Sequence, residues 1–306
     1  MGEISPQKYV WIDGRLIRWE DAKIHVVSNS LHYGLGVFEG IRAYKTRKGT
    51  AIFRLEEHII RFLNSGKVYR MNIRFTVEEL IEACKETVRV NRLEEAYIRP
   101  IAIKDCSDMS LNVRNYPSKV IIVAWPWGTY LGRAYEEGCK CMVSTWRRMP
   151  PSCLPTAAKA CGQYINSQLA RMEAAENGYD EAIMLDHRGF ISEGTGENIF
   201  IVKDEAFYTP PEYASILVGI TRNTVMELLK DQGYRVEEKD LTLSDLFNAD
   251  EAFFTGTAAE VTPIVNVNGI NIGNGKPGKL TRFIQKLYAK VVRGEIEEYE
   301  HWLTYV

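Results

Sequence analysis

One lysine, set in a run of small residues, constrains this chain of 306 residues more than any other feature. Lys159 lies in the segment Pro155-Thr156-Ala157-Ala158-Lys159-Ala160, which is small and mostly apolar. Apolar surroundings favour the neutral amine, which is the nucleophilic form of a lysine. Most lysines are solvated surface groups, so this interpretation depends on a second segment.

The second segment is Ile191-Ser192-Glu193-Gly194-Thr195-Gly196-Glu197-Asn198-Ile199-Phe200, a glycine-rich connection between strands. Its two glycines permit close approach of the backbone to a bound group. By composition alone, both Glu193 and Glu197 are candidates for the acid of such a site. Together, the lysine and the acid indicate a catalytic site.

The composition is that of a soluble globular protein, with 45% hydrophobic and 25% charged residues. The formal net charge of -2 leaves no basic surplus for binding a nucleic-acid backbone or an anionic membrane. The longest apolar run, at 120–127, is too short to span a bilayer, and residues 1–15 lack a signal-peptide pattern. We therefore expect a soluble cytoplasmic protein with no nucleic-acid or membrane partner.

The six cysteines do not form a recognisable redox or metal pattern. Cys139 and Cys141 are separated by one residue, which fits neither a redox C-x-x-C motif nor a zinc pair. The five histidines also lack H-x-x-x-H spacing. We expect mostly buried, reduced thiols and no metal site.

The length predicts two domains of ordinary size. We expect a small N-terminal α/β domain at 1–125, a connection at 126–137 and a large C-terminal α/β domain at 138–306. Strands of antiparallel spacing mixed with helices favour a mixed α/β (α+β) fold over a doubly wound parallel sheet. No G-x-G-x-x-G motif follows a strand, which disfavours a dinucleotide-binding fold.

Apolar periodicity and turn residues predict the individual elements. Asp13-Gly14 predicts a hairpin between strands at 9–12 and 15–17. Thr76 is expected to cap a helix whose apolar stripe continues to Val88. The other expected helices lie at 55–69, 162–177, 221–232 and 277–292, and the other expected strands at 96–103, 119–125, 140–145, 180–185 and 198–202.

With these two segments the chain resembles the branched-chain amino-acid aminotransferases, which are fold-type IV enzymes that use pyridoxal 5′-phosphate. The resemblance extends from about Val10 to about Trp302 and implies the two-domain fold of that class. It also implies a reversible, ping-pong transfer of the amino group from leucine, isoleucine or valine to 2-oxoglutarate, with glutamate as the other product.

The resemblance assigns the two central roles. Lys159 would form a Schiff base with the cofactor and then move the proton between the substrate α-carbon and the cofactor. The family order Ser-Glu-Gly-x-Gly-Glu-Asn selects Glu193, rather than Glu197, as the acid at the pyridine nitrogen. The full set of cofactor-binding residues that it implies is Arg61, Lys159, Tyr164, Glu193, Leu217, Gly219, Ile220, Thr221 and Thr257.

Several of these residues also have simpler explanations. Tyr164 matches the tyrosine that hydrogen-bonds the cofactor's phenolic oxygen, but alone it would be interpreted as a core tyrosine. Gly219 and Thr221 begin a predicted helix, where free N–H groups can bind a phosphate, although capping alone would explain Thr221. Arg61 would close the phosphate cup and Leu217 would pack on the ring.

The expected substrate pocket comes largely from the first half of the chain. Tyr97 and Arg99 lie on one strand face because side chains alternate along a strand. Arg99 with Tyr33 would bind the distal carboxylate of glutamate, and the turn at 257–259 would bind the α-carboxylate. The full set of expected substrate-binding residues is Tyr33, Phe38, Gly40, Tyr97, Arg99, Met109, Leu111, Trp127, Tyr130, Thr257, Ala258 and Ala259.

The loop at 105–112 bears on assembly and on substrate range. Met109 and Leu111 look like residues that reach a neighbouring subunit's site, which implies a homo-oligomer, either a dimer or a hexamer built as a trimer of dimers. The loop carries little glycine, whereas relatives are often glycine-rich here. This departure affects the expected range of substrates and the mobility of the loop, but not the expected type of reaction.

Two other members of the same fold remain as alternatives: D-amino-acid aminotransferase and aminodeoxychorismate lyase. Both would keep a lysine like Lys159 and an acid like Glu193. The run from Tyr33 to Arg42 and the Tyr97-x-Arg99 pattern favour the branched-chain enzyme. A non-catalytic carrier of pyridoxal phosphate would have lost the lysine or pocket residues, and none of them is missing.

Overall fold

The protein is represented by a computed structural model that describes residues 4–128 and 132–306. The chain divides into two compact units, and each is described by itself. Among the described residues, unit 1 contains 4–128, 158–162 and 291–306, and unit 2 contains 132–157 and 163–290.

Unit 1 includes two segments that the sequence placed in the C-terminal domain. The chain end belongs to it because β17 (Leu303–Tyr305) pairs antiparallel with β5 (Gly49–Phe53). The lysine segment belongs to it because Ala160 forms an antiparallel bridge with Val37. Hydrophobic periodicity could not predict either pairing, because both join residues that are far apart along the chain.

Unit 1 is built on an eight-stranded sheet in the order β17-β5-β4-β6-β7-β1-β2, in which β3 also pairs with β6. The strands pair antiparallel, and the predicted hairpin at Asp13-Gly14 is confirmed by the pairing of β1 with β2. The other strands of this sheet are β1 (Tyr9–Ile12), β2 (Arg15–Arg18), β3 (Gly36–Phe38), β4 (Ile41–Thr46), β6 (Ala96–Ile103) and β7 (Lys119–Trp125).

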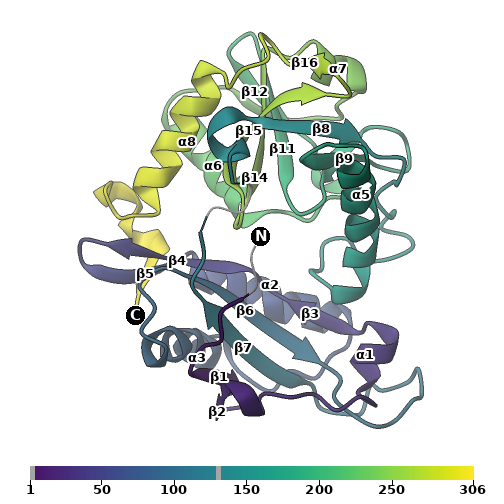
Figure 1. The fold of residues 1–306 in the computed structure, drawn as a ribbon, viewed down its shortest axis with the longest axis vertical. Helices are drawn as coiled ribbons and strands as arrows, with labels where there is room; N and C mark the ends of the chain where they lie inside the picture. Colours follow the sequence, from purple (N-terminus) through teal and green to yellow (C-terminus); the bar gives the residue numbers. More distant parts are fainter. Residues whose placement is uncertain (1–3, 129–131) are drawn as a thin grey trace. The chain divides into compact units, whose positions relative to one another are not determined.

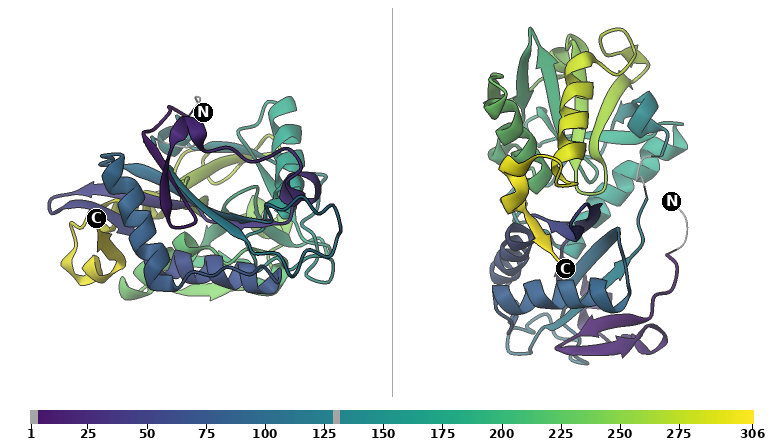
Figure 2. Two further views of the ribbon diagram at one scale, coloured as in Figure 1. Left: turned by 90° about the horizontal axis from the view of Figure 1, so that it is seen from below. Right: turned by 90° about the vertical axis from the view of Figure 1, so that its left-hand side faces the viewer.

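Two long helices pack against this sheet (Figures 1 and 2). In α2 (Leu55–Val68), Ile59 and Phe62 are fully buried, and α3 (Val77–Val90) buries Leu80 and Val88. Thr76 caps α3 as predicted, because its hydroxyl accepts from the Glu79 N–H and the Glu79 carboxylate accepts from the Thr76 N–H. The shorter helices of this unit are η1 (Trp19–Asp21), α1 (Asn29–Tyr33) and η4 (Glu297–Trp302).

Unit 2 is built on a nine-stranded mixed sheet in the order β10-β9-β8-β15-β14-β11-β12-β13, with β16 paired to β15. β8 runs parallel to both of its neighbours and β13 runs parallel to β12, whereas the other pairs are antiparallel. The strands are β8 (Cys139–Val143), β9 (Glu181–Leu185), β10 (Ile191–Gly194), β11 (Asn198–Lys203), β12 (Ala206–Thr209), β13 (Val236–Glu238), β14 (Glu251–Gly256), β15 (Glu260–Val267) and β16 (Ile270–Asn271).

The helices of the second half carry the apolar faces that the periodicity predicted. In α6 (Ile220–Asp231), for example, Val225, Leu228 and Leu229 are fully buried. No helix in the described ranges is long and apolar enough to cross a membrane. The other helices are α4 (Ala134–Glu137), η2 (Cys161–Gln163), α5 (Tyr164–Glu176), η3 (Glu212–Ala214), α7 (Leu243–Phe247) and α8 (Lys279–Val291).

The mixed α/β class is therefore confirmed. All six cysteines are free, as expected, and three of them are buried. Cys139 and Cys141 project from the same strand with their sulfur atoms 3.6 Å apart, as a thiol contact and not a disulfide.

Candidate functional site

The expected site residues are divided between the two units, and each group is described within its own unit. In unit 1, the main chain of Lys159 is fixed on both sides. Its carbonyl accepts from the Phe38 N–H at 3.0 Å, and its own N–H donates to the Ser65 hydroxyl at 3.0 Å. The half-buried side chain of Lys159 places its Nζ 5.2 Å from the centre of the Phe38 ring.

Close packing of glycines gives the lysine segment its position against β3. A Cβ added at Gly36 would lie 3.0 Å from the Cys161 sulfur and 3.2 Å from the Ala102 carbonyl. A Cβ added at Gly34, whose φ is +72°, would lie 3.5 Å from the Cα of Gly162. Glycine at these positions lets the two backbones approach each other.

Arg61 belongs to a buried polar cluster in unit 1, which it forms with Glu39 and His58. Its Nε donates to Glu39 Oε1 at 2.6 Å and its Nη2 donates to Glu39 Oε2 at 2.9 Å. His58 Nδ1 lies 2.8 Å from the same Oε2 atom. Glu39 is fully buried, and His58 is 2% exposed.

Burial and neighbouring charges determine the protonation states of Glu39 and His58. Burial alone would raise the pKa of the Glu39 carboxyl, but the charge of Arg61 and the contact with His58 hold it far below its ordinary value. Burial lowers the pKa of His58. At neutral pH, the neutral imidazole therefore donates its Nδ1–H to a carboxylate that is already paired with a guanidinium.

The aromatic rings of Tyr97, Trp125 and Trp127 pack close to one another in unit 1. The Tyr97 ring lies 4.6 Å from the Trp127 ring and 5.2 Å from the Trp125 ring, measured between centroids. A Cβ added at Gly40 would lie 2.0 Å from the Tyr97 hydroxyl oxygen. Glycine at 40 is therefore what allows the Tyr97 side chain to occupy its position.

Arg99 lies on the same strand face as Tyr97, as the alternation predicted. Its guanidinium is 4.7 Å from the centre of the Phe38 ring and 5.3 Å from that of Tyr97, and its Nη2 donates to the Tyr97 hydroxyl at 3.2 Å. The Nε of Arg99 is buried and has no hydrogen-bond partner in the described part of the chain. A buried, unpaired donor of this kind favours a ligand that accepts hydrogen bonds.

The other expected substrate residues of the first half lie at the surface of unit 1. Tyr33 donates from its hydroxyl to the Met109 carbonyl at 3.1 Å. Tyr33, Met109 and Leu111 are 48%, 42% and 83% exposed. Tyr130 lies outside the described residues.

In unit 2, Glu193 is a buried carboxylate that contacts Arg148, Asn198 and Leu217. Its Oε1 lies 2.9 Å from the Nε of Arg148, which is itself 5% exposed. Its Oε2 accepts from the Asn198 side-chain amide at 3.1 Å and from the Leu217 N–H at 3.0 Å. These contacts stabilise an ionised carboxylate in a buried position.

Glu197 has a different environment from Glu193. Burial raises the pKa of Glu197, and the nearby Glu181 carboxylate raises it further. Its Oε2 accepts from the Gly196 N–H at 3.0 Å, so the side chain folds back onto its own loop. The geometry therefore favours Glu193, and not Glu197, as the charged acid of this segment.

The start of α6 is tied to Glu193 through Asn198. The Asn198 amide also donates to the Leu217 carbonyl at 2.9 Å. A Cβ added at Gly219, the N-cap residue of α6, would lie 2.0 Å from the Asn198 side-chain oxygen. The helix start thus combines free N–H groups with close backbone approach, which suits an anionic group.

The remaining expected residues of unit 2 occupy turns and helix starts. Thr221 is 3% exposed in the first turn of α6, after Ile220, and Tyr164 is half-buried at the start of α5. Thr257, Ala258 and Ala259 form the turn between β14 and β15.

Sequence reasoning missed five residues that organise these groups. Glu39 and Asn198 stood inside recognised motifs but were given no role, and His58 lies one helical turn before Arg61, a spacing that brings side chains together. Ser65 follows Arg61 by four residues and donates to its carbonyl at 2.8 Å. Arg148 lies far from Glu193 along the chain and had no sequence signal.

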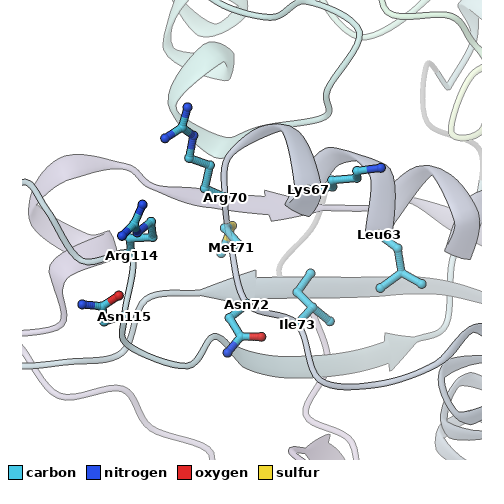
Figure 3. A pocket seen from close by; sticks show the side chains of 8 residues that line it. All are labelled: Leu63, Lys67, Arg70, Met71, Asn72, Ile73, Arg114 and Asn115. Carbon is cyan, nitrogen blue, oxygen red and sulfur yellow. The ribbon is translucent and has the colours of Figure 1, made fainter.

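A separate hollow of about 630 Å³ in unit 1 contains none of the expected site residues (Figure 3). Three of its residues are cationic and three are apolar. It is lined by Leu63, Lys67, Arg70, Met71, Asn72, Ile73, Arg114 and Asn115.

Comparison with known proteins gives one consistent result. A family model described as amino-transferase class IV matches residues 36–267. The chain is 47% identical to the branched-chain-amino-acid aminotransferase of Escherichia coli strain K12, over 97% of each chain. It resembles the solved branched-chain amino acid aminotransferase of T.th., complexed with N-(5′-phosphopyridoxyl)-L-glutamate, with a TM-score of 0.93 and 45% identity over 98% of each chain.

A second solved structure extends this similarity to a more distant relative. The branched-chain amino acid aminotransferase of Thermobaculum terrenum, in its PLP-form, matches with a TM-score of 0.91 and 36% identity over 98% of each chain.

The contact between Gly219 and Asn198 generates a prediction. Gly219→Ala should lower the free energy of unfolding by about 1–3 kcal/mol, because the added methyl group overlaps the Asn198 side chain. Gly196→Ala is the matched control, since a Cβ there meets no atom within 4 Å. Urea denaturation of both variants checks this, and equal stability of the two would contradict it.

Proposed function

The chain belongs to the amino-transferase class IV family, and on this premise we propose that it is a branched-chain amino-acid aminotransferase that uses pyridoxal 5′-phosphate. It transfers the amino group of leucine, isoleucine or valine to 2-oxoglutarate and forms glutamate. The observation that carries this proposal is 47% identity over nearly the whole length of a branched-chain-amino-acid aminotransferase, with the lysine and the buried acid both present.

The residues present fit the cofactor. Lys159 offers an amine whose main chain is fixed from both sides. Glu193 offers an ionised, buried carboxylate for the ring nitrogen. The start of α6, where only glycine fits at 219, offers N–H groups for the phosphate, and Arg61 offers a guanidinium. When bound, pyridoxal phosphate supplies an electron sink for the substrate α-carbon.

The protein's own groups then have distinct tasks. Lys159 would hold the cofactor through its amine, and as a free amine it would take and return the proton at the substrate α-carbon. Glu193, which lies 2.9 Å from the Nε of Arg148, would hold a proton on the ring nitrogen. Tyr164 would donate to the phenolic oxygen, and Leu217 would pack on the ring.

The phosphate and the substrate α-carboxylate are bound mainly by main-chain N–H groups. In unit 2, Gly219, Ile220 and Thr221 at the start of α6 would bind the phosphate, as would Thr257. In unit 1, Arg61 would supply a guanidinium for it. The turn Thr257-Ala258-Ala259 binds the α-carboxylate of the substrate.

One pocket has to accept both a branched aliphatic chain and glutamate. Phe38, Tyr97 and Trp127 would provide apolar surface for the aliphatic chain, and Tyr33 would add to it. Arg99, whose Nε is a buried donor, binds the distal carboxylate of glutamate. The glutamate adduct in the T.th. relative supports an acidic second substrate.

Replacement of the lysine tests the reaction directly. Lys159→Ala should lower turnover of leucine with 2-oxoglutarate by roughly 10²–10⁴-fold or more, because the general base is lost. Borohydride reduction followed by peptide mass spectrometry should find the cofactor on Lys159 only in the unmodified chain. Lys45→Ala, at an exposed lysine paired with Glu94, is the control. Normal turnover in Lys159→Ala would refute the assignment.

The two half-reactions test the role of Arg99. Arg99→Ala should slow the glutamate half-reaction by about 10- to 100-fold, since a charge-assisted hydrogen bond contributes about 1.5–3 kcal/mol. The leucine half-reaction should change little, because leucine has no distal carboxylate. Single-turnover absorbance of the cofactor measures each separately, with the exposed Arg89→Ala as control. Equal loss of rate in both half-reactions would contradict this role of Arg99 and would favour a D-amino-acid aminotransferase.

The chain also forms a homo-oligomer, a dimer or a hexamer of three dimers, in which Met109 and Leu111 reach the neighbouring site. Support comes from the exposure of Tyr33, Met109 and Leu111, which are apolar or aromatic and lie on contacting segments. Light scattering should give a mass of at least two chains, and Leu111→Asp should shift it downward. A fully active monomer would contradict this proposal.

A further inference from the structure

Glu39 is a fully buried charged group of unit 1, and the proposed reaction gives it no task. Its carboxylate is fully buried and contacts Arg61 Nε, Arg61 Nη2 and His58 Nδ1 at 2.6, 2.9 and 2.8 Å. The Gly40 N–H donates to the same carboxylate at 3.2 Å. The main chain of Glu39 is also fixed, because its N–H donates to the Pro100 carbonyl at 2.8 Å.

The contact with Arg61 determines the orientation of the guanidinium. Two parallel hydrogen bonds along the Nε–Nη2 edge fix its plane, which a single contact would not do. Arg61 comes from α2, whereas Glu39 follows β3, so the contact joins two elements of the unit. A free arginine side chain loses rotamer entropy when it binds a ligand, and this contact removes much of that cost in advance.

We propose that Glu39 is the positioning residue of the phosphate site, which orients Arg61 toward the phosphate monoester of the cofactor before the cofactor arrives. This inference rests on the proposed function, because it concerns the same cofactor. Glu39 itself carries a charge of the same sign as the phosphate, so it acts on the phosphate through Arg61.

A purely electrostatic role of Glu39 predicts the opposite change in phosphate affinity when its charge is removed. If Glu39 only neutralised Arg61, removal of its charge would strengthen the attraction of Arg61 for a phosphate dianion. If Glu39 positions Arg61, removal of its charge weakens phosphate binding, because the guanidinium loses its fixed plane. The sign of the change therefore separates the two roles.

The experiment compares pyridoxal 5′-phosphate with pyridoxal, which differs only in lacking the phosphate. The holoenzyme is stripped of cofactor, and the dissociation constant of each compound is measured by absorbance. Glu39→Gln should reduce the preference for the phosphorylated compound by about tenfold or more, the range of a charge-assisted hydrogen bond. Its affinity for pyridoxal should not change.

The matched control is Glu57→Gln. Glu57 lies on the same helix as Arg61, but it is a partly exposed carboxylate paired with Arg54 at 2.7 Å. This variant should retain the preference of the unmodified chain. A Glu39→Gln variant with an unchanged or increased preference would overturn the proposal.

A second comparison covers the case in which Glu39→Gln does not fold because Arg61 is left without its counter-charge. The double variant Glu39→Gln/Arg61→Gln removes both charges and should fold. It should show the same preference as Arg61→Gln alone, because Glu39 acts through Arg61. A further loss in the double variant would overturn the proposal. Failure of the unmodified chain to bind pyridoxal phosphate would instead refute the proposed function.

Discussion

Two main-chain hydrogen bonds at Lys159 are the constraint on which the unit 1 groups depend. One comes from the Phe38 N–H and the other goes to the Ser65 hydroxyl, so the lysine lies between β3 and α2. Ser65 in turn donates to the Arg61 carbonyl. A side chain as flexible as lysine can serve as a base only when its attachment point is fixed, because proton transfer needs hydrogen-bond distances. The Lys159 main chain is therefore part of the same hydrogen-bond network as Arg61.

The long periodic elements could be predicted from the sequence, because burial imposes a repeat. The predicted strands at 96–103 and 119–125 match β6 and β7, and α2 and α3 begin where the pattern placed them. Strands β3, β4, β5, β10, β12, β13, β14, β15 and β16 were not predicted. Several of them, such as β3, β10 and the eight-residue β15, are buried almost throughout and show no alternation. The position of β17 could not be predicted, because its pairing with β5 joins the chain end to residue 53 and nearby.

Candidate site residues could be named from the sequence, but not the contacts that fix them in place. Lys159, Glu193 and the glycine at 219 carried motif signals, because their chemistry restricts the neighbouring residue types. Arg148 carried none, because a buried ion pair between distant segments leaves no local pattern. Glu39 was overlooked because a glutamate next to an aromatic residue has no distinctive sequence pattern. Its partners Arg61 and His58 come from another part of the chain and are seen only in the structure.

The contact between Gly40 and Tyr97 has a consequence for how such a pocket can vary between related enzymes. The Tyr97 hydroxyl occupies the space that any side chain at 40 would need, with only 2.0 Å to the position of a Cβ. A mutation at 40 alone would displace the tyrosine, whereas one that first shortened the residue at 97 would open room at 40. The two positions are therefore sterically coupled, and a side chain at 40 fits only after the residue at 97 has become smaller.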